Sequence, residues 1–373
     1  MKALLVAGAR PNFMKVAPIL RALRARGAEA VLVHTGQHYD AQMSDAFFRD
    51  LDIPAPDHHL GIGSGTHAEQ TARIMLAFEP VLSATRPDWV VVVGDVNSTI
   101  ACALVASKLR DALGCRIAHV EAGLRSNDWG MPEEVNRVLT DRLSDLLLLP
   151  SRDAEANLLA EGIPRERIAF AGNVMIDSLL AKVTEAIATD LPVRLGIERG
   201  QYVVTTLHRP SNVDTPEALR VVLEGLAAVA ERLPVVLPIH PRTRRNAEAF
   251  RLGALLARIR TIEPLGYLEM LSLTEGAAVV LTDSGGLQEE TTALGVPCVT
   301  LRAQTERPVT VTEGTNRMAP WPLTAHGMLS AFEDALALGS GGRQPCAIEG
   351  WDGRASERIV SALLERARSA SSP

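Results

Sequence analysis

The sequence predicts an α/β protein built from two doubly wound, parallel-sheet (Rossmann-like) domains that face each other across a cleft. Short apolar runs without polar alternation, as expected for strands buried on both faces of a sheet, alternate with stretches of helical period. This alternation of strand and helix patterns is interrupted at 182–200, which contains Pro192, Gly196 and Gly200, and resumes after it. A length of 373 residues also suits two cores better than one.

In the first domain the predicted strands are 3–7, 30–35, 89–93, 116–120, 145–149 and 167–170, and the helices are 15–26, 66–86, 98–112, 132–143 and 151–161. In the second domain the strands are 202–207, 235–239, 259–262, 278–282 and 297–301, and the helices are 216–232, 242–257, 266–275 and 286–294. A last helix at 354–368 has Ile359, Val360 and Leu363 at helical spacing and is expected to cross back onto the first domain. The predicted domains are therefore 1–181, joined by the C-terminal helix 354–373, and 182–353.

Composition limits the class of protein. The 38 Lys and Arg residues against 44 Asp and Glu residues give a net charge of −6, which argues against nucleic acid or an anionic membrane as a bulk partner. The chain has no apolar segment long enough to span a bilayer, and its first apolar run stops at Arg10, too early for a secretory leader. The four cysteines are scattered without a Cys-x-x-Cys pair, which favours buried thiols in the cytoplasm.

Two turns are candidate anion sites. The first apolar run ends in a turn at 8–12 that contains Gly8, Arg10 and Pro11, and the following helix carries Lys15. A tight turn before a helix N-terminus exposes N–H groups that favour an anion, and two cations would strengthen it. The segment reads either as such a site or as a plain turn with two solvated cations.

The second candidate is the Asp-Ser-Gly-Gly stretch at 283–286, between a buried strand and a helix. Its two glycines allow backbone amides to approach a phosphate closely, and Ser284 can donate to a phosphate oxygen. The acidic pair Glu289 and Glu290, one turn later, suits the hydroxyl groups of a ribose or sugar. The alternative is a helix with an ordinary N-cap and a glycine that allows close packing. That alternative needs only one glycine, so the second glycine favours the phosphate site.

Three acids are predicted to converge on one crevice. Asp95 and Glu121 each follow a strand, and Glu133 opens a helix on which Arg137 lies four residues later, on the same face. Any one of them fits a structural role, such as a helix cap or a favourable charge at a helix N-terminus. Three acids around one crevice favour acid–base chemistry.

Two histidines, His208 and His240, also leave strands, in the second domain. Each fits either a structural hydrogen bond or a place at the ligand. The chain has no His-x-x-x-His or Glu-x-x-His helix, so no metal is predicted. The loop 61–65 lacks the third glycine of a dinucleotide turn, and no tyrosine precedes a lysine by four residues, so no nicotinamide or other cofactor is predicted.

These motifs together resemble the non-hydrolysing UDP-N-acetylglucosamine 2-epimerases. The matching stretches, in order and at similar spacing up to about residue 320, are Gly-Ala-Arg-Pro-Asn-Phe-Met-Lys15, Thr-Gly-Gln-His38, Gly-Asp95, His-Val-Glu121-Ala-Gly-Leu-Arg, Pro-Glu133-Glu-Val-Asn-Arg137, His208-Arg, His240-Pro, Asp-Ser284-Gly-Gly-Leu-Gln-Glu-Glu290, Thr-Glu-Arg-Pro308 and Gly-Thr-Asn-Arg317. The resemblance implies a glycosyltransferase-B-like fold, a homodimer, and interconversion of UDP-N-acetylglucosamine and UDP-N-acetylmannosamine.

By position, the resemblance implies two groups of site residues. The catalytic group is Asp95, Glu121, Glu133 and His208. The group around UDP and the sugar is Arg10, Lys15, Arg137, Arg209, His240, Ser284, Gly285, Gly286, Glu290 and Arg317. Two departures stand out: Asn12 replaces a glutamate found in many bacterial members, and the stretch 39–43 lacks the arginine of members that a second substrate molecule activates.

The expected mechanism is elimination and re-addition of UDP. The hydrogen to be inverted is not α to a carbonyl, so a base cannot remove it unaided, but it becomes acidic once departing UDP leaves an oxocarbenium-like ring. Three alternatives remain: a 2-epimerase of a related UDP-diacetamido or uronic sugar, a UDP-sugar glycosyltransferase on the same scaffold, and a catalytically silent nucleotide-sugar sensor.

Overall fold

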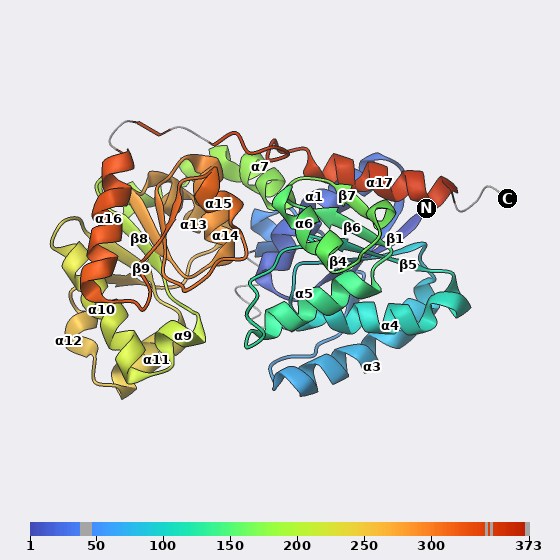
Figure 1. Ribbon diagram of the computed structural model, residues 1–373, viewed down its shortest axis with the longest axis horizontal. Helices are drawn as coiled ribbons and strands as arrows, with labels where there is room; N and C mark the ends of the chain where they lie inside the picture. The colour runs from blue at the N-terminus through green and yellow to red at the C-terminus, as the bar shows by residue number, and fades with distance from the viewer. Residues whose placement is uncertain (38–46, 340–341, 344–345, 370–373) are drawn as a thin grey trace. The chain divides into compact units, whose positions relative to one another are not determined.

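The computed structural model describes residues 1–37, 47–339, 342–343 and 346–369, and the side chains of Arg10, 368 and 369 are not among the described atoms. The chain divides into two compact units, one formed by Met1–Ala181 with Glu349–Pro373 and the other by Lys182–Ile348. Each unit contains a parallel sheet with helices packed against it (Figure 1). The predicted α/β class with two parallel-sheet domains is confirmed.

The first unit is built on a sheet with the strand order β3-β2-β1-β4-β5-β6-β7, in which neighbouring strands are parallel. Its strands are β1 Lys2–Ala7, β2 Glu29–His34, β3 His58–His59, β4 Trp89–Val93, β5 Arg116–Val120, β6 Leu146–Leu149 and β7 Ile168–Phe170. Its helices are α1 Arg10–Ala25, α3 His67–Thr85, α4 Asn97–Leu113, α5 Pro132–Leu143, α6 Asp153–Ala160, the 3₁₀ turn Arg165–Arg167, the first part of α7 Val174–Ala188, and α17 Ala355–Ser369. The central strand β4 is entirely apolar and buried, because helices cover both of its faces.

The second unit has the strand order β10-β9-β8-β11-β12-β13, again parallel throughout. Its strands are β8 Val203–Thr206, β9 Val235–Pro238, β10 Arg260–Ile262, β11 Val279–Thr282, β12 Cys298–Thr300 and β13 Asn316–Met318. Its helices are α8 Leu191–Arg194, α9 Pro210–Val213, α10 Pro216–Ala230, α11 Pro241–Ala249, α12 Gly253–Leu256, α13 Tyr267–Gly276, α14 Gly285–Leu294, α15 Val309–Thr312 and α16 Ala325–Gly339. Helices α10 and α16 lie side by side on one face of this sheet (Figure 1).

Two predictions of local structure are wrong. The single helix predicted at 242–257 is two helices, α11 and α12, because Arg251 between them has a φ of +57°, which a right-handed helix does not accept. The connection predicted at 182–200 begins as helix, since α7 continues to Ala188. The proline and glycines that suggested a break lie beyond that point.

The C-terminal helix α17 packs beside α1 in the first unit (Figure 1). Its side chains Ile359, Val360 and Leu363 are fully buried, as their helical spacing predicts. The carboxylate of Asp177 accepts hydrogen bonds from the first two backbone N–H groups of α17, at 3.0 and 2.7 Å. Burial raises the pKa of Asp177, although these hydrogen bonds oppose the shift.

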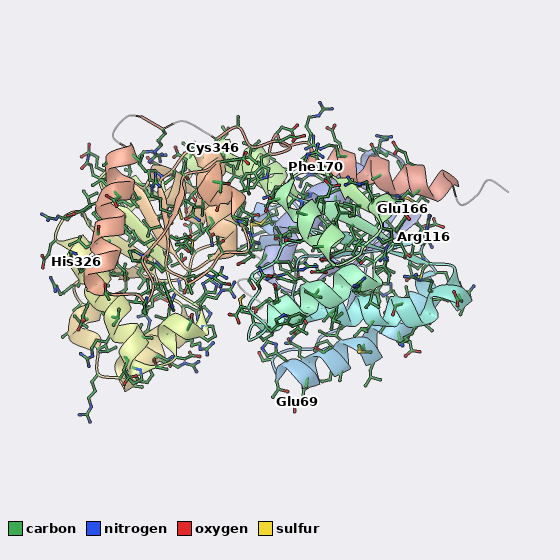
Figure 2. The ribbon with its side chains drawn as sticks, in the orientation of Figure 1. Glu69, Arg116, Glu166, Phe170, His326 and Cys346 are labelled. Carbon is green, nitrogen blue, oxygen red and sulfur yellow. The ribbon has the colours of Figure 1, made fainter. Side chains whose placement is uncertain are left out.

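The far end of α17 is held by arginines that bind backbone carbonyls. Arg116 donates to the carbonyl of Arg366 at 2.7 Å, and Arg366 donates to the carbonyl of Glu166 at 2.6 Å. Arg116 and Glu166 are labelled in Figure 2, on the side of the first unit that α17 covers. The helix is therefore fixed at both ends and along its apolar face.

In the part of the chain that the structure describes, no helix has the length and apolarity needed to cross a membrane. Cys102, Cys115 and Cys298 are buried thiols, as predicted, whereas Cys346 is partly exposed.

Candidate functional site

Each sheet has one point at which the strand order reverses, and the predicted site residues follow the strands on either side of it. In the first unit that point lies between β1 and β4, and Lys15 and Asp95 come after these strands. In the second unit it lies between β8 and β11, followed by His208 and Ser284. Ligands of open α/β sheets bind outside the carboxyl ends of the strands at this reversal, because the flanking loops diverge there.

In the first unit, two of the predicted acids follow neighbouring strands and each contacts a cation. Asp95 follows β4, and its Oδ2 lies 2.7 Å from Nη2 of Arg137. Glu121 follows β5, is 8% exposed, and forms an ion pair with the Lys15 ammonium group. Gly94, with a φ of +64°, leaves room for the second pair: a methyl group added there would lie 2.9 Å from Lys15 Nζ and 3.9 Å from Oε2 of Glu121.

The backbone of Glu121 is itself unusual. Its φ is +69°, in the left-handed region that non-glycine residues seldom adopt. Such conformations cost about 1–3 kcal/mol and persist where surrounding contacts enforce them, often at functional sites. Here the Lys15 ion pair and a hydrogen bond from the Glu121 N–H to the Leu148 carbonyl, at 3.1 Å, hold it.

The two adjacent glutamates of α5 have different surroundings. Glu134 is buried and accepts from the backbone N–H groups of Ser126 and Asn127, at distances between 2.8 and 3.1 Å, and from Arg137. It therefore fixes the loop before α5 and the guanidinium that contacts Asp95. Glu133, the predicted catalytic residue, is partly exposed in the first turn of the same helix.

In the second unit, His208 is oriented by a buried carboxylate. Its Nδ1 lies 2.8 Å from Oδ1 of Asp283, which is fully buried, while the imidazole is about half exposed. Burial alone would raise the pKa of Asp283, but the His208 side chain and the backbone N–H groups of His208 and Arg209 bring it below its usual range. A carboxylate–histidine pair of this kind fixes the orientation of the ring.

The Ser-Gly-Gly turn begins α14, as predicted. Ser284 occupies the N-cap position, yet within the described residues its hydroxyl makes no capping hydrogen bond, so the simple N-cap interpretation does not account for it. A methyl group on Gly285 would lie 2.5 Å from Nη1 of Arg307 and 2.9 Å from Oε1 of Glu306. Gly285 therefore allows close packing against Arg307 and Glu306. Gly286, the second glycine, also adds no side chain to the turn.

Glu290, one turn into α14, is 5% exposed. Burial, the largest cause, and the charge of Glu289 raise the pKa of Glu290 to about 8. A hydrogen bond from Tyr267 partly opposes this shift. The carboxyl group is therefore largely protonated at neutral pH in this arrangement.

This raised pKa predicts a pH-dependent stability. The pKa of Glu290 in the folded protein is about 8, above its ordinary value of 4.5, so folding takes up a proton between about pH 4.5 and 8. The free energy of unfolding therefore decreases as the pH rises through that window, because the buried carboxyl group must lose its proton. We expect Glu290→Gln to be more stable than the natural protein at pH 9, by a few kcal/mol (order of magnitude), and to differ less at pH 5. Urea unfolding at both pH values measures this, and equal differences would contradict it.

The remaining predicted contacts are placed as follows. Arg209 is partly buried, with Nη2 3.9 Å from Oε1 of Glu306. His240 is exposed and its Nδ1 accepts from the Arg242 N–H at 3.2 Å, so it caps α11. Arg317 is exposed on the edge strand β13. The side chain of Arg10 and the stretch 39–43 lie outside the described residues.

Several residues that shape the site were not among the predicted site residues, although most of them stand in the quoted motifs. They are Asn12, His119, Glu134, Asp141, Asp283, Glu306 and Arg307. Asn12 shows why: its Oδ1 accepts from the N–H groups of Gly8 and Ala9, both at 3.0 Å, and its Nδ2 donates to the Val93 carbonyl at 3.1 Å. It thus joins the turns after β1 and β4, a role that spacing along the chain does not reveal.

No group of three His, Cys, Asp or Glu side chains suited to a metal ion occurs among the described residues. The first unit offers carboxylates paired with cations, and the second unit offers a carboxylate-bound histidine and a glycine-containing helix start. Such a set can bind a diphosphate and move a proton.

Comparison with known proteins identifies the family. A family model described as UDP-N-acetylglucosamine 2-epimerase matches residues 21–364. The UDP-N-acetylglucosamine 2-epimerase of Methanocaldococcus jannaschii is 42% identical, over 97% of this chain and 99% of that protein. The UDP-2,3-diacetamido-2,3-dideoxy-D-glucuronate 2-epimerase of Pseudomonas aeruginosa is 46% identical over 85% and 87%.

Solved structures agree. The crystal structure of the M. jannaschii enzyme in complex with UDP-GlcNAc and UDP superposes with a TM-score of 0.88, at 40% identity over 98% of this chain and 100% of that one. A sucrose-phosphate synthase of Thermosynechococcus elongatus, 15% identical with a TM-score of 0.62 over both full chains, shares the fold alone. With its two parallel-sheet units and its acids and Ser-Gly-Gly turn at the strand ends, the chain belongs to the UDP-N-acetylglucosamine 2-epimerase family and is an isomerase.

Proposed function

We propose that the protein interconverts UDP-N-acetylglucosamine and UDP-N-acetylmannosamine by elimination and re-addition of UDP. The observation that carries the proposal is the pair of carboxylates, Asp95 and Glu121, at the ends of adjacent strands, each with its own cation. Relatives named for this epimerisation, and one solved with UDP-GlcNAc and UDP, support the choice of substrate.

In the proposed reaction, the bond between C1 of the sugar and the diphosphate breaks first, and UDP keeps the electron pair. The ring is then oxocarbenium-like, the hydrogen on C2 is acidic, and a carboxylate of the first unit removes it to give the unsaturated sugar. A proton is returned to the opposite face of C2 as UDP adds again to C1. Atoms and charge balance over the cycle, and no oxidant is needed.

The roles of the residues follow from the charges that develop. We assign Asp95, Glu121 and Glu133 to the proton transfers and to the cationic ring. We assign His208, held by Asp283, to the departing diphosphate, together with the Ser284 turn, Arg209 and Arg317. Preorganised donors aimed at developing charge are commonly the largest catalytic term, and losing one costs about 3–4 kcal/mol.

Proton exchange tests the proposal directly. The protein is incubated with UDP-N-acetylglucosamine in deuterium oxide, without any acceptor, and the reaction is followed by proton NMR. We expect UDP-N-acetylmannosamine to form, and deuterium to replace the hydrogen at C2 of both the substrate and the product. A glycosyltransferase would leave the sugar unchanged without an acceptor, and a silent sensor would leave C2 protonated. Either result contradicts the proposal.

A second candidate is the diacetamido-glucuronate substrate of the Pseudomonas relative. That sugar carries an extra carboxylate, which needs a cation to receive it. In the described part of the first unit's site, Lys15 and Arg137 already contact Glu121, Asp95 and Glu134, so the charge balance favours the uncharged sugar. Measuring kcat/KM for both substrates distinguishes the two functions. We expect kcat/KM to be at least about 100-fold larger for UDP-N-acetylglucosamine than for the diacetamido-glucuronate.

We also propose a homodimer that acts in the cytoplasm. The first unit exposes Leu76, Trp129 and Leu139, apolar side chains suited to an interface, and its free buried thiols suit a reducing compartment. Light scattering during size-exclusion chromatography is expected to give twice the 40.0 kDa of one chain.

A further inference from the structure

His119, on β5, lies between the two turns that present the catalytic acids. Its Nε2 is 2.8 Å from the carbonyl oxygen of Gly94, the residue before Asp95. Its Nδ1 is 2.7 Å from Oδ1 of Asp141 on α5. The imidazole is completely buried, as is Asp141, so water does not compete for either contact.

The Gly94 carbonyl has no hydrogen to give, and a lone pair facing a carbonyl oxygen would be repelled, so Nε2 carries the hydrogen of this contact. Nδ1 shares a hydrogen with Oδ1 of Asp141. The other oxygen of Asp141 accepts from the Gly123 N–H at 3.1 Å and lies 2.8 Å from Nη1 of Arg125, so the carboxyl group is held in place.

Arginines hold Asp141, whose carboxyl group faces Nδ1. Arg125 is shared between Asp141 and Glu161, which it binds through Nε and Nη2 at 2.7 and 2.9 Å. Arg167 also donates to the backbone carbonyl of Asp141, at 3.4 Å. The partner of Nδ1 is therefore fixed independently of the ring.

The contacts connect both acid-bearing turns through one ring. On one side the ring fixes the Gly94 carbonyl, and Asn136 fixes the next carbonyl, that of Asp95, at 2.9 Å. On the other side Asp141 fixes Gly123, two residues after Glu121. Glu121 has a positive φ, which is costly for a residue other than glycine, so its turn needs such contacts to keep its conformation.

We propose that His119 is a positioning residue for the epimerisation, which through its Nε2–H holds the Gly94 carbonyl and so sets the place of the Asp95 carboxylate relative to Glu121. The inference rests on the proposed function, because it needs Asp95 to act on the sugar. His119 itself does not touch the substrate.

Two amide variants separate the two hydrogen bonds. In His119→Gln the amide nitrogen reaches the place of Nε2 and keeps the bond to the Gly94 carbonyl. In His119→Asn the amide nitrogen reaches the place of Nδ1, keeps the bond to Asp141 and leaves the Gly94 carbonyl without it. His119→Asn is expected to lower kcat by about 100-fold, the cost of a shift of about 1 Å in a catalytic group. KM should change less than about threefold, because ground-state binding is retained.

His119→Gln is expected to restore kcat to within about tenfold of the natural enzyme, since the positioning bond is kept. His326→Asn, on an exposed histidine of α16 that Figure 2 labels, serves as the matched control and is expected to leave kcat unchanged. The proposal is overturned if His119→Asn keeps its kcat, or if both amide variants lose kcat and thermal stability equally, as simple packing predicts. Failure of the natural enzyme to epimerise would instead overturn the proposed function.

A measurement on the natural protein does not depend on variants folding. Nitrogen-15 NMR of histidine-labelled protein, assigned by difference with His119→Gln, reports the hydrogen on each ring nitrogen. At the pH of the activity assay Nε2 of His119 is expected at the shift of a protonated nitrogen. An unprotonated Nε2 overturns the proposal.

Discussion

Replacing Glu121 by Gln is expected to lower kcat for epimerisation by about 10²–10⁴-fold, the usual contribution of a positioned acid–base group. The amide has nearly the same shape, so it can occupy the left-handed turn, but it cannot take up a proton or balance the cationic ring. Lys15 also loses its anionic partner. Coupled detection of UDP-N-acetylmannosamine and the rate of deuterium entry at C2 both measure the effect.

Both rates should fall together, because elimination and proton loss belong to one sequence. UDP binding is expected to persist, since most of its proposed contacts belong to the second unit. Glu79→Gln, an exposed glutamate of α3, is the control and should leave both rates unchanged. Full turnover by Glu121→Gln would remove Glu121 from the mechanism.

Replacing Gly172 by Ala is expected to destabilise the first unit by about 3–5 kcal/mol, among the largest effects of a single methyl group. Gly172 has a φ of +85°, and a methyl group there would lie 2.1 Å from the carbonyl oxygen of Gly350 and 2.8 Å from Nη2 of Arg358. Gly350 is tightly packed in turn against Phe170. The backbone of the returning C-terminal segment must therefore move away, and urea unfolding followed by tryptophan fluorescence measures the loss.

Gly162→Ala is the matched control in the same unit. Gly162 has a φ of +75°, but a methyl group there would meet nothing within 4 Å. It should show only the cost of the left-handed conformation, about 1–2 kcal/mol. If the two variants lose equal stability, close packing against Gly350 is not the cause.

The sequence predicted the two parallel sheets because their signals are local. Strands buried on both faces, such as β4 with its run of valines, read as apolar runs, and the intervening helices carry an apolar face. Some of the elements that the sequence analysis did not predict lack such a signal, and one, α16, has it. The two-residue strand β3 and the polar strand β13 carry no apolar run, whereas α16 does place Met328 and Phe332 at helical spacing.

The site was predictable in part. Acids and glycines at strand ends identify a candidate directly, because parallel strands end at one edge of a sheet. Which acid carries out chemistry and which supports it is not a local property. Glu133 and Glu134 are neighbours, yet Glu134 is buried and accepts from backbone N–H groups, whereas Glu133 is partly exposed. Likewise Asp283 gave no signal of its own in the sequence, and its contact with His208 shows its role.

The return of α17 to the first unit has a consequence for synthesis on the ribosome. Residues 182–348 emerge as a continuous stretch that contains the whole second unit, whereas the first unit still lacks the helix that covers α1. Domains of a nascent chain usually mature in order from the N-terminus. Here the order of completion is reversed: the half of the protein that carries Asp95 and Glu121 gains its last buried layer only after the other half has been made.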